Sequence, residues 1–471
     1  MVRSRAYQSA TLLAVLLALV ASGLSTLLAS WLLKVRAIDA FGGSLALLLS
    51  VIGAVMTVSW VRLRLAAPRG SLEGLGSLIF GLGSLLAVVV PGWQLHEGTR
   101  KSILTSLGVT SNLVEDDIPR AFILFACCLA AFSVFELSGT REEASTSGVK
   151  RLPSRLSWNA REVYYALMIM GSPVTLLLSR GSRSSAFSQR GTAHGQGVIV
   201  VLGYCVPLAI ALGLTYRHWG SKRLAAVSAV ATLAFTVVTG TRTPLILLAC
   251  AAVPRVVRWL TRRGARPQAY GAALLAMYCG AGLVIGVAQW RHSVTTGEGV
   301  GLADSISAGM VNPIGGLAQQ GGLDTVDGAV LSLNVKRSDL GVSYFDPTKA
   351  LTTLVPYQLW PDKPKFLGPE VSHYYTLFGG NAGIFLSGPG YGAIVYGGIP
   401  GATALFAILG YATRRVLRAR AHGIGTGLFI YFLVRFFFGG DAFDAFHVLN
   451  LCIGLGLASV LAYLFNQTRA A

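Results

Sequence analysis

The chain alternates long apolar segments with short polar ones, and this pattern predicts its architecture. A membrane-spanning helix needs roughly 20 apolar residues, and twelve segments are candidates, some of them short. They cover residues 9–33, 40–61, 74–92, 119–138, 160–179, 196–215, 224–239, 244–259, 269–289, 385–412, 425–439 and 446–465. We therefore expect an all-α polytopic membrane protein of about 12 transmembrane helices, in which residues 1–471 form a single integral membrane domain.

One segment, between the ninth and tenth spans, is far longer than the other loops. It covers residues 290–384, is rich in glycine and carries charges of both signs. Short helices are expected in it at Leu302–Gln319 and Asp324–Leu333. Because long loops in compact proteins are usually functional, we expect this large loop to contribute to the activity.

The composition agrees with a membrane protein. Hydrophobic residues make up 53% of the chain and charged residues only 13%, whereas soluble domains carry about 25% charged residues. This excludes a soluble globular protein, a disordered chain and a secreted disulfide scaffold. The net charge of +19 is compatible with a nucleic-acid partner, but the basic residues punctuate apolar runs instead of forming a solvated face, so no nucleic acid is expected. The six cysteines lie in apolar runs without metal-ligand spacing, and no metal is expected.

The positive-inside rule assigns a side to every loop. With the N-terminus in the cytoplasm, the cytoplasmic segments hold 23 of the 39 Lys and Arg residues and five of the 20 Asp and Glu residues. The opposite side holds 16 bases and 15 acids, so almost all of the +19 net charge lies on one side. Both termini are therefore expected in the cytoplasm, and the large loop over 290–384 is expected to be extracytoplasmic.

Six arginines on the extracytoplasmic side lie within a few positions of an apolar boundary. Arginine presents a planar, permanently charged group that suits phosphate, so these residues favour a negatively charged lipid headgroup such as a lipid-linked diphosphate. The alternative for each is a side chain that reaches the membrane interface without binding a ligand. The six are Arg180, Arg183, Arg190, Arg242, Arg291 and Arg435.

That alternative is weakest for Arg242 and Arg435. Arg242 lies in the hairpin Gly240–Pro244 between two short spans. Pro244 favours a helix start there, and the amides of a helix start bind anions; the alternative is an ordinary tight hairpin. Arg435 lies within the apolar and aromatic run Leu433–Phe438, and charged groups in such positions usually face an internal aqueous cavity.

The large loop carries candidate sugar-binding and catalytic residues. Its segment Pro356–Lys365 is rich in aromatic, proline and charged residues, which favours sugar binding but is also typical of a rigid exposed loop. His373 is a candidate general base toward a hydroxyl, and a structural histidine is the alternative. His447 and the pair Asp441 and Asp444 compete for the same role. The candidate substrate contacts are Trp360, Lys363, Lys365, Tyr374 and Tyr375.

Three sequence elements together resemble the O-antigen polymerase (Wzy) family of oligosaccharide repeat-unit polymerases, and more distantly the O-antigen ligases. They are the Thr-Gly-Thr-Arg-Thr-Pro hairpin at 239–244, the segment Leu359–Pro364, and Ser387–Gly392 running into Tyr396–Gly398. The large late loop and the twelve-span layout fit as well, and the resemblance covers about 180–470. Ala393 stands where many relatives have a Glu, so the resemblance implies no acid role at that position.

The resemblance implies a membrane glycosyltransferase of the multispan GT-C type, a multi-pass protein of the bacterial cytoplasmic (inner) membrane whose active site faces the periplasm. Its donor and acceptor would be polysaccharide repeat units, such as those of lipopolysaccharide O-antigen, linked to undecaprenyl diphosphate. An acceptor hydroxyl attacks the donor anomeric carbon and undecaprenyl diphosphate leaves, without a nucleotide, a metal or another cofactor. The expected partners are the lipid bilayer and a chain-length regulator protein. The diphosphate is assigned to Arg190, Arg242, Arg291 and Arg435, and further substrate contacts to Arg180 and Arg183.

Two other functions stay open at this stage. One is ligation, in which finished glycan is transferred to another acceptor by similar chemistry. The other is transport of lipid-linked oligosaccharides by a flippase, because twelve spans with both ends inside is also a common transporter layout. Transporters often consist of two similar halves, and the unpaired loop over 290–384 argues against that symmetry.

Overall fold

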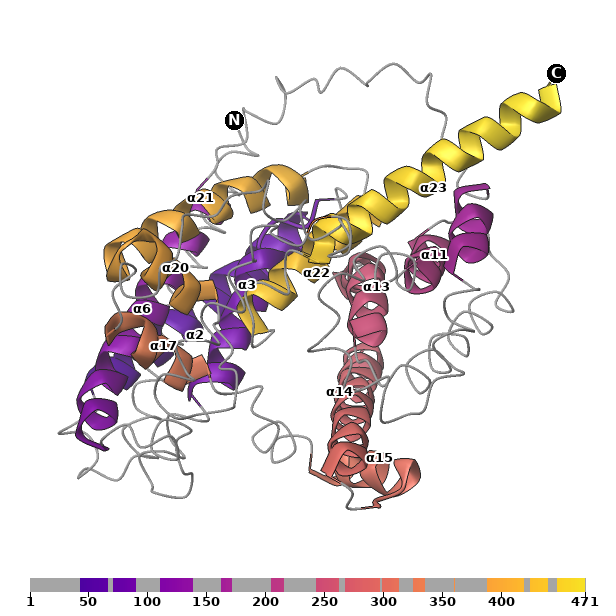
Figure 1. Cartoon of the computed structure of the whole chain (residues 1–471). Helices are drawn as coiled ribbons and strands as arrows, with labels where there is room; N and C mark the ends of the chain where they lie inside the picture. The colour runs from indigo at the N-terminus through magenta and orange to yellow at the C-terminus, as the bar shows by residue number, and fades with distance from the viewer. Residues whose placement is uncertain are drawn as a thin grey trace, which may run out of the picture.

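The computed structural model describes residues 43–66, 71–89, 111–138, 162–171, 205–215, 243–261, 267–296, 299–312, 325–334, 360, 388–418, 424–438 and 447–470. Within these ranges the chain is almost entirely helical and contains no β-strand. Several helices pack together around α6 (Ser111–Leu137), whereas α13 and α14 run away from that bundle (Figure 1). The expectation of an all-α fold is confirmed for this part of the chain.

Two described helices, α2 (Gly43–Ala66) and α6, are long and apolar enough to cross a membrane. The pair α20 (Gly388–Tyr396) and α21 (Gly398–Arg418) makes a third span if the two helices are counted as one. Shorter apolar helices accompany them, among them α22 (Ile424–Phe438). Helices of this composition and length are typical of a membrane protein, while the layout of twelve spans stays a prediction.

The central helix α6 sets the length scale of the bundle. Its buried polar residues Asp117 and Glu136 are 19 positions apart, which corresponds to about 28 Å along a helix. The hydrocarbon core of a bilayer is about 30 Å thick, so the two residues mark the two ends of a membrane-sized bundle. We refer to these as the Asp117 end and the Glu136 end.

At the Glu136 end, a carboxylate caps a helix other than its own. Glu136 is fully buried and accepts four hydrogen bonds from the start of α3 (Leu75–Ser84). The donors are the N–H groups of Gly74 at 3.2 Å, Gly76 at 3.1 Å and Ser77 at 2.6 Å, and the Ser77 hydroxyl. Gly74, the N-cap residue of α3, has a φ of 90° and no side chain to cap the helix. Glu136 therefore satisfies the amides that a helix start leaves without intrahelical partners.

The last turn of α21 joins the same end. The Leu72 N–H donates to the Leu417 carbonyl at 2.9 Å, and Arg418 forms an ion pair with Glu73 at 3.1 Å. The charge pattern of the sequence assigned Glu73, Glu136 and Arg418 to one side of the membrane, and the structure gathers all three at one end. Which end faces the cytoplasm stays a prediction.

An aromatic cluster fills the bundle between these ends. The Phe437 ring of α22 stacks on Phe80 of α3 at 4.2 Å between centroids and meets Phe132 of α6 edge-on at 5.3 Å. Phe406 of α21 lies 5.0 Å from Phe80. All four side chains are buried, so four helices share one apolar core, whose burial supplies the main favourable contribution to packing in this region.

The structure differs from the expected continuous span over 385–412. The chain bends by 118° between α20 and α21. Gly397 and Gly398 form the junction with φ angles of 89° and 72°, a left-handed conformation that glycine adopts readily and other residues rarely. A Cβ atom at Gly401 would overlap the Tyr396 backbone, so α20 folds back closely against α21. The apolar run that predicted a span here is therefore helical but bent, and apolar length alone does not predict a bend at a glycine pair.

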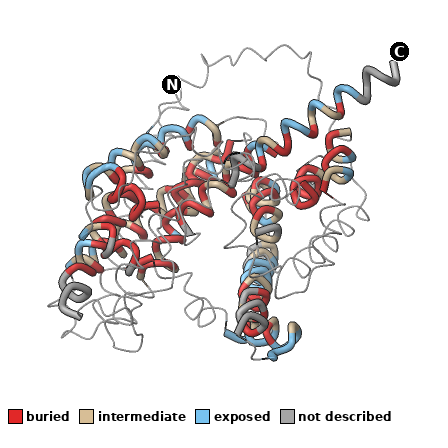
Figure 2. The backbone as a smooth tube through the Cα atoms, in the orientation of Figure 1, coloured by how far each residue is buried: buried red, intermediate tan, exposed pale blue. Residues whose placement is uncertain are grey.

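The helices α13 (Thr243–Thr261) and α14 (Pro267–Thr296) lead into the large loop. Helix α14 continues past Trp290, and α15 (Leu302–Val311) then packs against it. The backbones of the two helices are in close contact at glycines. At Gly286, for example, a Cβ atom would lie only 2.5 Å from the Ile306 Cα. The middle of α14 is exposed, in contrast to the buried bundle helices (Figure 2).

Both helices predicted within the large loop are present. Helix α15 begins at Leu302 as expected but ends at Val311 instead of Gln319. The second is α17 (Thr325–Asn334), within one residue of the expected Asp324–Leu333. Unlike a surface appendage, α17 packs into the bundle, where its buried residues Val326, Ala329 and Val330 join the core.

The remaining described helices form a second cluster. It includes α11 (Cys205–Thr215), the helix over 162–171, and the beginning of α22. Helix α23 (His447–Ala470) packs against α11 and α22 and then extends away (Figure 1). All six cysteines are free, and several are buried among apolar residues, as expected for small apolar side chains in membrane helices.

Candidate functional site

A charged side chain lies buried in the core of the bundle. Arg435 is in the last turns of α22 and is only 6% exposed. Its neighbours along the helix, Leu433, Phe436 and Phe437, are buried apolar residues. Arginine in such surroundings carries a large desolvation cost, and ionisable residues within membrane helices are usually functional.

The contact between Phe437 and Phe132 shows where the end of α22 meets α6. Phe132 is four residues from Glu136 and 15 from Asp117 along α6, or about 6 Å and about 22 Å along the helix axis. The Phe437 ring, in the last described turn of α22, therefore packs on α6 nearer to the Glu136 end than to the Asp117 end. The expected position of Arg435 near the extracytoplasmic boundary of its span stays a prediction.

Helix α20 begins against α22, at the residue that follows Arg435. Gly388, its first residue, packs so closely on Phe436 that a Cβ would overlap both the ring and the backbone of that phenylalanine. Tyr391, one turn further on, meets Phe436 edge-on at 6.4 Å between ring centroids. The start of α20, which carries the partial positive charge of a helix start, therefore packs on the same helix as Arg435.

Helix α13 forms another side of this region. It packs against α22, where Gly427 lies close to Ala251. Cys250, the residue before Ala251 on α13, lies close enough to Arg435 for the two to interact electrostatically. The Arg435 side chain thus lies at the α13–α22 contact. Thr243, the first residue of α13, directly follows Arg242 in the chain.

The candidate site is the region where α22 contacts the start of α20 on one side and α13 on another. It combines a buried guanidinium, a helix start and aromatic side chains, which suits an anion with an attached apolar or sugar portion. Within the described ranges, no group of three or more His, Cys, Asp or Glu side chains could hold a metal ion.

Most of the other predicted site residues lie outside the described residues. Trp360 is among the described residues, and its side chain is 42% exposed. This exposure fits a contact with sugar and equally fits an ordinary surface position. Arg291 lies in the last two turns of α14, where the backbone alone is described. Those outside are Arg180, Arg183, Arg190, Arg242, Lys363, Lys365, His373, Tyr374, Tyr375, Asp441 and Asp444.

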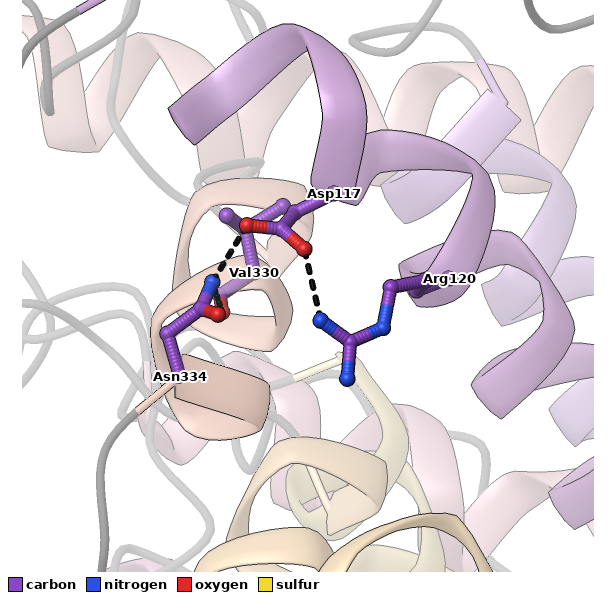
Figure 3. A network of polar contacts seen from close by, with 4 residues as sticks. All are labelled: Asp117, Arg120, Val330 and Asn334. Carbon is purple, nitrogen blue, oxygen red and sulfur yellow. Dashed lines mark hydrogen bonds and ion pairs between the residues drawn. The ribbon is translucent and has the colours of Figure 1, made fainter. Parts of the chain in front are cut away.

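A polar network at the Asp117 end was not predicted from the sequence. Asp117 is 5% exposed, and its carboxylate accepts hydrogen bonds from Arg120 at 2.8 Å and from Asn334 of α17 at 2.6 Å (Figure 3). The Arg120 side chain is 54% exposed. The sequence did indicate the pair of Asp117 and Arg120, because a spacing of three residues allows an acid and a base to pair on a helix. Nothing in the sequence indicated Asn334 as the third member.

The described part of the chain is almost entirely helical, has two helices, or three with the bent pair, that are long and apolar enough to cross a membrane, and buries Arg435 in α22. The chain matches no protein-family model, and neither the curated proteins nor the solved structures contain a significant match to it.

Proposed function

We propose that the chain is a membrane glycosyltransferase that polymerises undecaprenyl-diphosphate-linked oligosaccharide repeat units at the outer leaflet of a bacterial cytoplasmic membrane. The observation that carries the proposal is the buried Arg435 in α22, whose next residue, Phe436, packs on the start of α20. The start of α20 belongs to one of the sequence elements that resemble O-antigen polymerases. A diphosphate leaving group requires such fixed positive charge.

Helix α13 supports a role for Arg242 in the same site. It begins at Thr243, the residue after Arg242, and packs against α22, the helix of Arg435. The proposal is that both guanidinium groups, joined by Arg190 and Arg291, neutralise the diphosphate.

The proposed reaction is a glycosyl transfer. The acceptor hydroxyl of one lipid-linked repeat unit forms a bond to the anomeric carbon of the donor glycan. The bond between that carbon and the diphosphate oxygen breaks, and undecaprenyl diphosphate leaves with the electron pair. The hydroxyl proton passes to a general base, for which His373 is the candidate. Trp360, Tyr374 and Tyr375 would hold the sugars, and no metal takes part.

One observation also favours the transport alternative. Discontinuous helices, such as the pair α20 and α21 with its 118° bend, are typical of transporters, in which they form the substrate site. Ligation would use the same site as polymerisation with a different acceptor. The three functions are separated by their products and not by the geometry of the site.

The test uses the purified protein in proteoliposomes that contain an undecaprenyl-diphosphate-linked repeat unit. We expect glycans that lengthen by whole repeats, and about a 100-fold loss of this activity in Arg435→Ala, the usual scale for losing one preorganised charge-stabilising group. Arg435→Lys keeps the charge but loses the planar fork, and should lose about tenfold. The control is Arg415→Lys, on an exposed part of α21, which should behave like the natural protein.

The other functions give different results. Transfer of finished glycan to added lipid A core, without lengthening, indicates a ligase. Movement of the intact lipid-linked unit across the bilayer without a new product indicates a transporter. Polymer formed at the normal rate by Arg435→Ala would overturn the assignment of the diphosphate to this site.

A further inference from the structure

Two helix ends meet at the Glu136 end of the bundle. The Ser71 N–H donates to the carbonyl of Ala66, the last residue of α2, at 3.4 Å. The Ser71 hydroxyl donates to the carbonyl of Leu417, in the last turn of α21, at 3.3 Å. The chain that follows α2 therefore joins the end of α2 to the end of α21, and both ends belong to one surface of the bundle.

These two helix ends are strongly basic. Residues 60–66 of α2 and 408–418 of α21 contain no acid and five arginines, which are Arg62, Arg64, Arg414, Arg415 and Arg418. Arg64 and Arg415 are exposed. The nearby carboxylates of Glu136 and Glu73 are engaged, the first by the start of α3 and the second by Arg418. The joined helix ends therefore present positive charge at the rim of the bundle.

The exposed face of α21 changes from apolar to basic over two turns. Ile408 and Tyr411 are both exposed, and Arg415 follows one turn after the tyrosine. Spacings of three and four residues place the three side chains on one face of the helix. Tyrosine is enriched where a membrane protein passes from hydrocarbon to headgroups, so this order is typical of a helix that leaves the bilayer at Tyr411.

The Tyr411 side chain orients the guanidinium of Arg415. The Nε and Nη2 groups of Arg415 donate to the Tyr411 hydroxyl oxygen at 3.1 and 2.6 Å, and the guanidinium carbon lies 5.2 Å from the ring centroid. The Arg414 guanidinium lies 6.0 Å from the same centroid. A guanidinium carries five N–H donors and binds phosphate well. Two guanidinium groups around one interfacial tyrosine therefore suit an anionic headgroup.

Exposed apolar side chains accompany the arginines. Gly410 of α21 packs on the backbone of Phe132, and Phe135, three residues further along α6, is exposed. On α2, Leu65 is exposed directly beside Arg64. A bilayer interface offers anionic headgroups and acyl chains next to each other, whereas a soluble acidic partner offers mainly charge. The mixture of charge and apolar surface therefore favours a lipid.

We infer that this surface, centred on Arg64, Tyr411 and Arg415, binds the headgroups of anionic phospholipids in the cytoplasmic leaflet. The guanidinium groups meet the lipid phosphates, and the exposed apolar side chains beside them meet the acyl chains. The inference goes beyond the proposed glycosyl transfer and does not depend on it, because the surface lies at the other end of the bundle from the large loop. The predicted orientation decides only which leaflet supplies the lipid.

The test measures lipid binding to the purified full-length protein in a non-ionic detergent by native mass spectrometry. The probes are phosphatidylglycerol, which is anionic, and phosphatidylcholine, which has no net charge. We expect phosphatidylglycerol to bind more tightly. Arg64→Gln/Arg415→Gln should weaken its tightest binding about 25-fold, since each basic group near an anionic surface contributes about fivefold. The matched control is Arg120→Gln, an exposed arginine at the Asp117 end, which should bind like the natural protein.

Two further measurements guard against a variant that fails to fold. Arg64→Lys/Arg415→Lys keeps both charges and should lose less than about fivefold. In the natural protein, added salt should weaken the binding of phosphatidylglycerol, because exposed charges are screened. Equal binding of the two lipids, or unchanged binding in the glutamine variant, would overturn the inference. Displacement of the lipid by soluble polyglutamate would point to an acidic protein partner, and displacement by inorganic phosphate to a free anion; either result would also overturn it.

Discussion

Glu136 shows how one residue can organise the packing of two helices. Its carboxylate replaces the cap that Gly74 cannot provide for α3. The arrangement requires glycine as well, because a Cβ at Gly74 would lie 2.5 Å from the Ser59 carbonyl oxygen. The carboxylate and the glycine therefore depend on each other: the glycine permits the close approach, and the carboxylate satisfies the amides that this approach buries.

We expect Glu136→Gln to destabilise the protein by about 2 kcal/mol, the scale of a hydrogen bond to a charged group. The glutamine amide would place N–H donors against the N–H groups of α3. The measurement is the thermal unfolding midpoint in detergent, with Glu73→Gln as the comparison. The Glu73 side chain is 22% exposed and forms an ion pair with Arg418. Because this pair is partly open to solvent, the loss for Glu73→Gln should be smaller. Equal midpoints for the two variants would contradict the capping role.

Arg435 is 6% exposed, and burying a guanidinium is costly to folding. On the proposed function this charge serves to bind the diphosphate, so removing it should affect activity more than stability. The Arg435→Ala variant should therefore unfold at a temperature similar to that of the natural protein while losing about 100-fold of its activity. A variant that unfolds far below the natural protein would indicate a structural role for the arginine.

At the scale of elements, the apolar pattern predicted helix positions well and helix relationships poorly. The helices α2, α6 and α17 lie close to their expected bounds because apolar length and turn residues are local properties. The hydrogen bond between Asn334 and Asp117 joins residues 217 positions apart, and no local signal indicates such a pair. The cap of α3 by Glu136 was missed for the same reason.

The bend between α20 and α21 belongs to this scale too. We expect Gly401→Ala to destabilise the protein, because the new methyl group would overlap the Tyr396 backbone. The matched control is Gly425→Ala in α22, where a Cβ meets open space and the change should be neutral or stabilising by up to about 1 kcal/mol. Thermal unfolding compares the two. Equal effects would show that α20 does not pack on α21 as described.

For the whole molecule, the sidedness expected from the charges has a structural counterpart. Groups assigned to one side meet at the Glu136 end, and Asp117 meets the large loop at the other end. The sequence could predict this grouping because basic residues concentrate in alternate loops. It could not predict the aromatic cluster, because its ring contacts join four helices that are far apart in the sequence.

Cysteine labelling in intact cells tests the orientation. Asp304→Cys in α15 and Arg415→Cys in α21 are both at exposed positions. A maleimide that cannot cross the membrane should label the first in intact cells and the second only after the membrane is opened, because the positive-inside rule places α15 outside. The reverse pattern, or labelling of both in intact cells, would contradict the predicted topology.

The central claim is that this protein forms glycosidic bonds between lipid-linked repeat units. Mass spectrometry of the reaction in proteoliposomes measures both products at once. The proposed function predicts a ladder of lipid-linked glycans that differ by one repeat, with one undecaprenyl diphosphate released for every bond formed. A lipid-linked repeat unit that remains intact, on either side of the bilayer, with no undecaprenyl diphosphate released would contradict it.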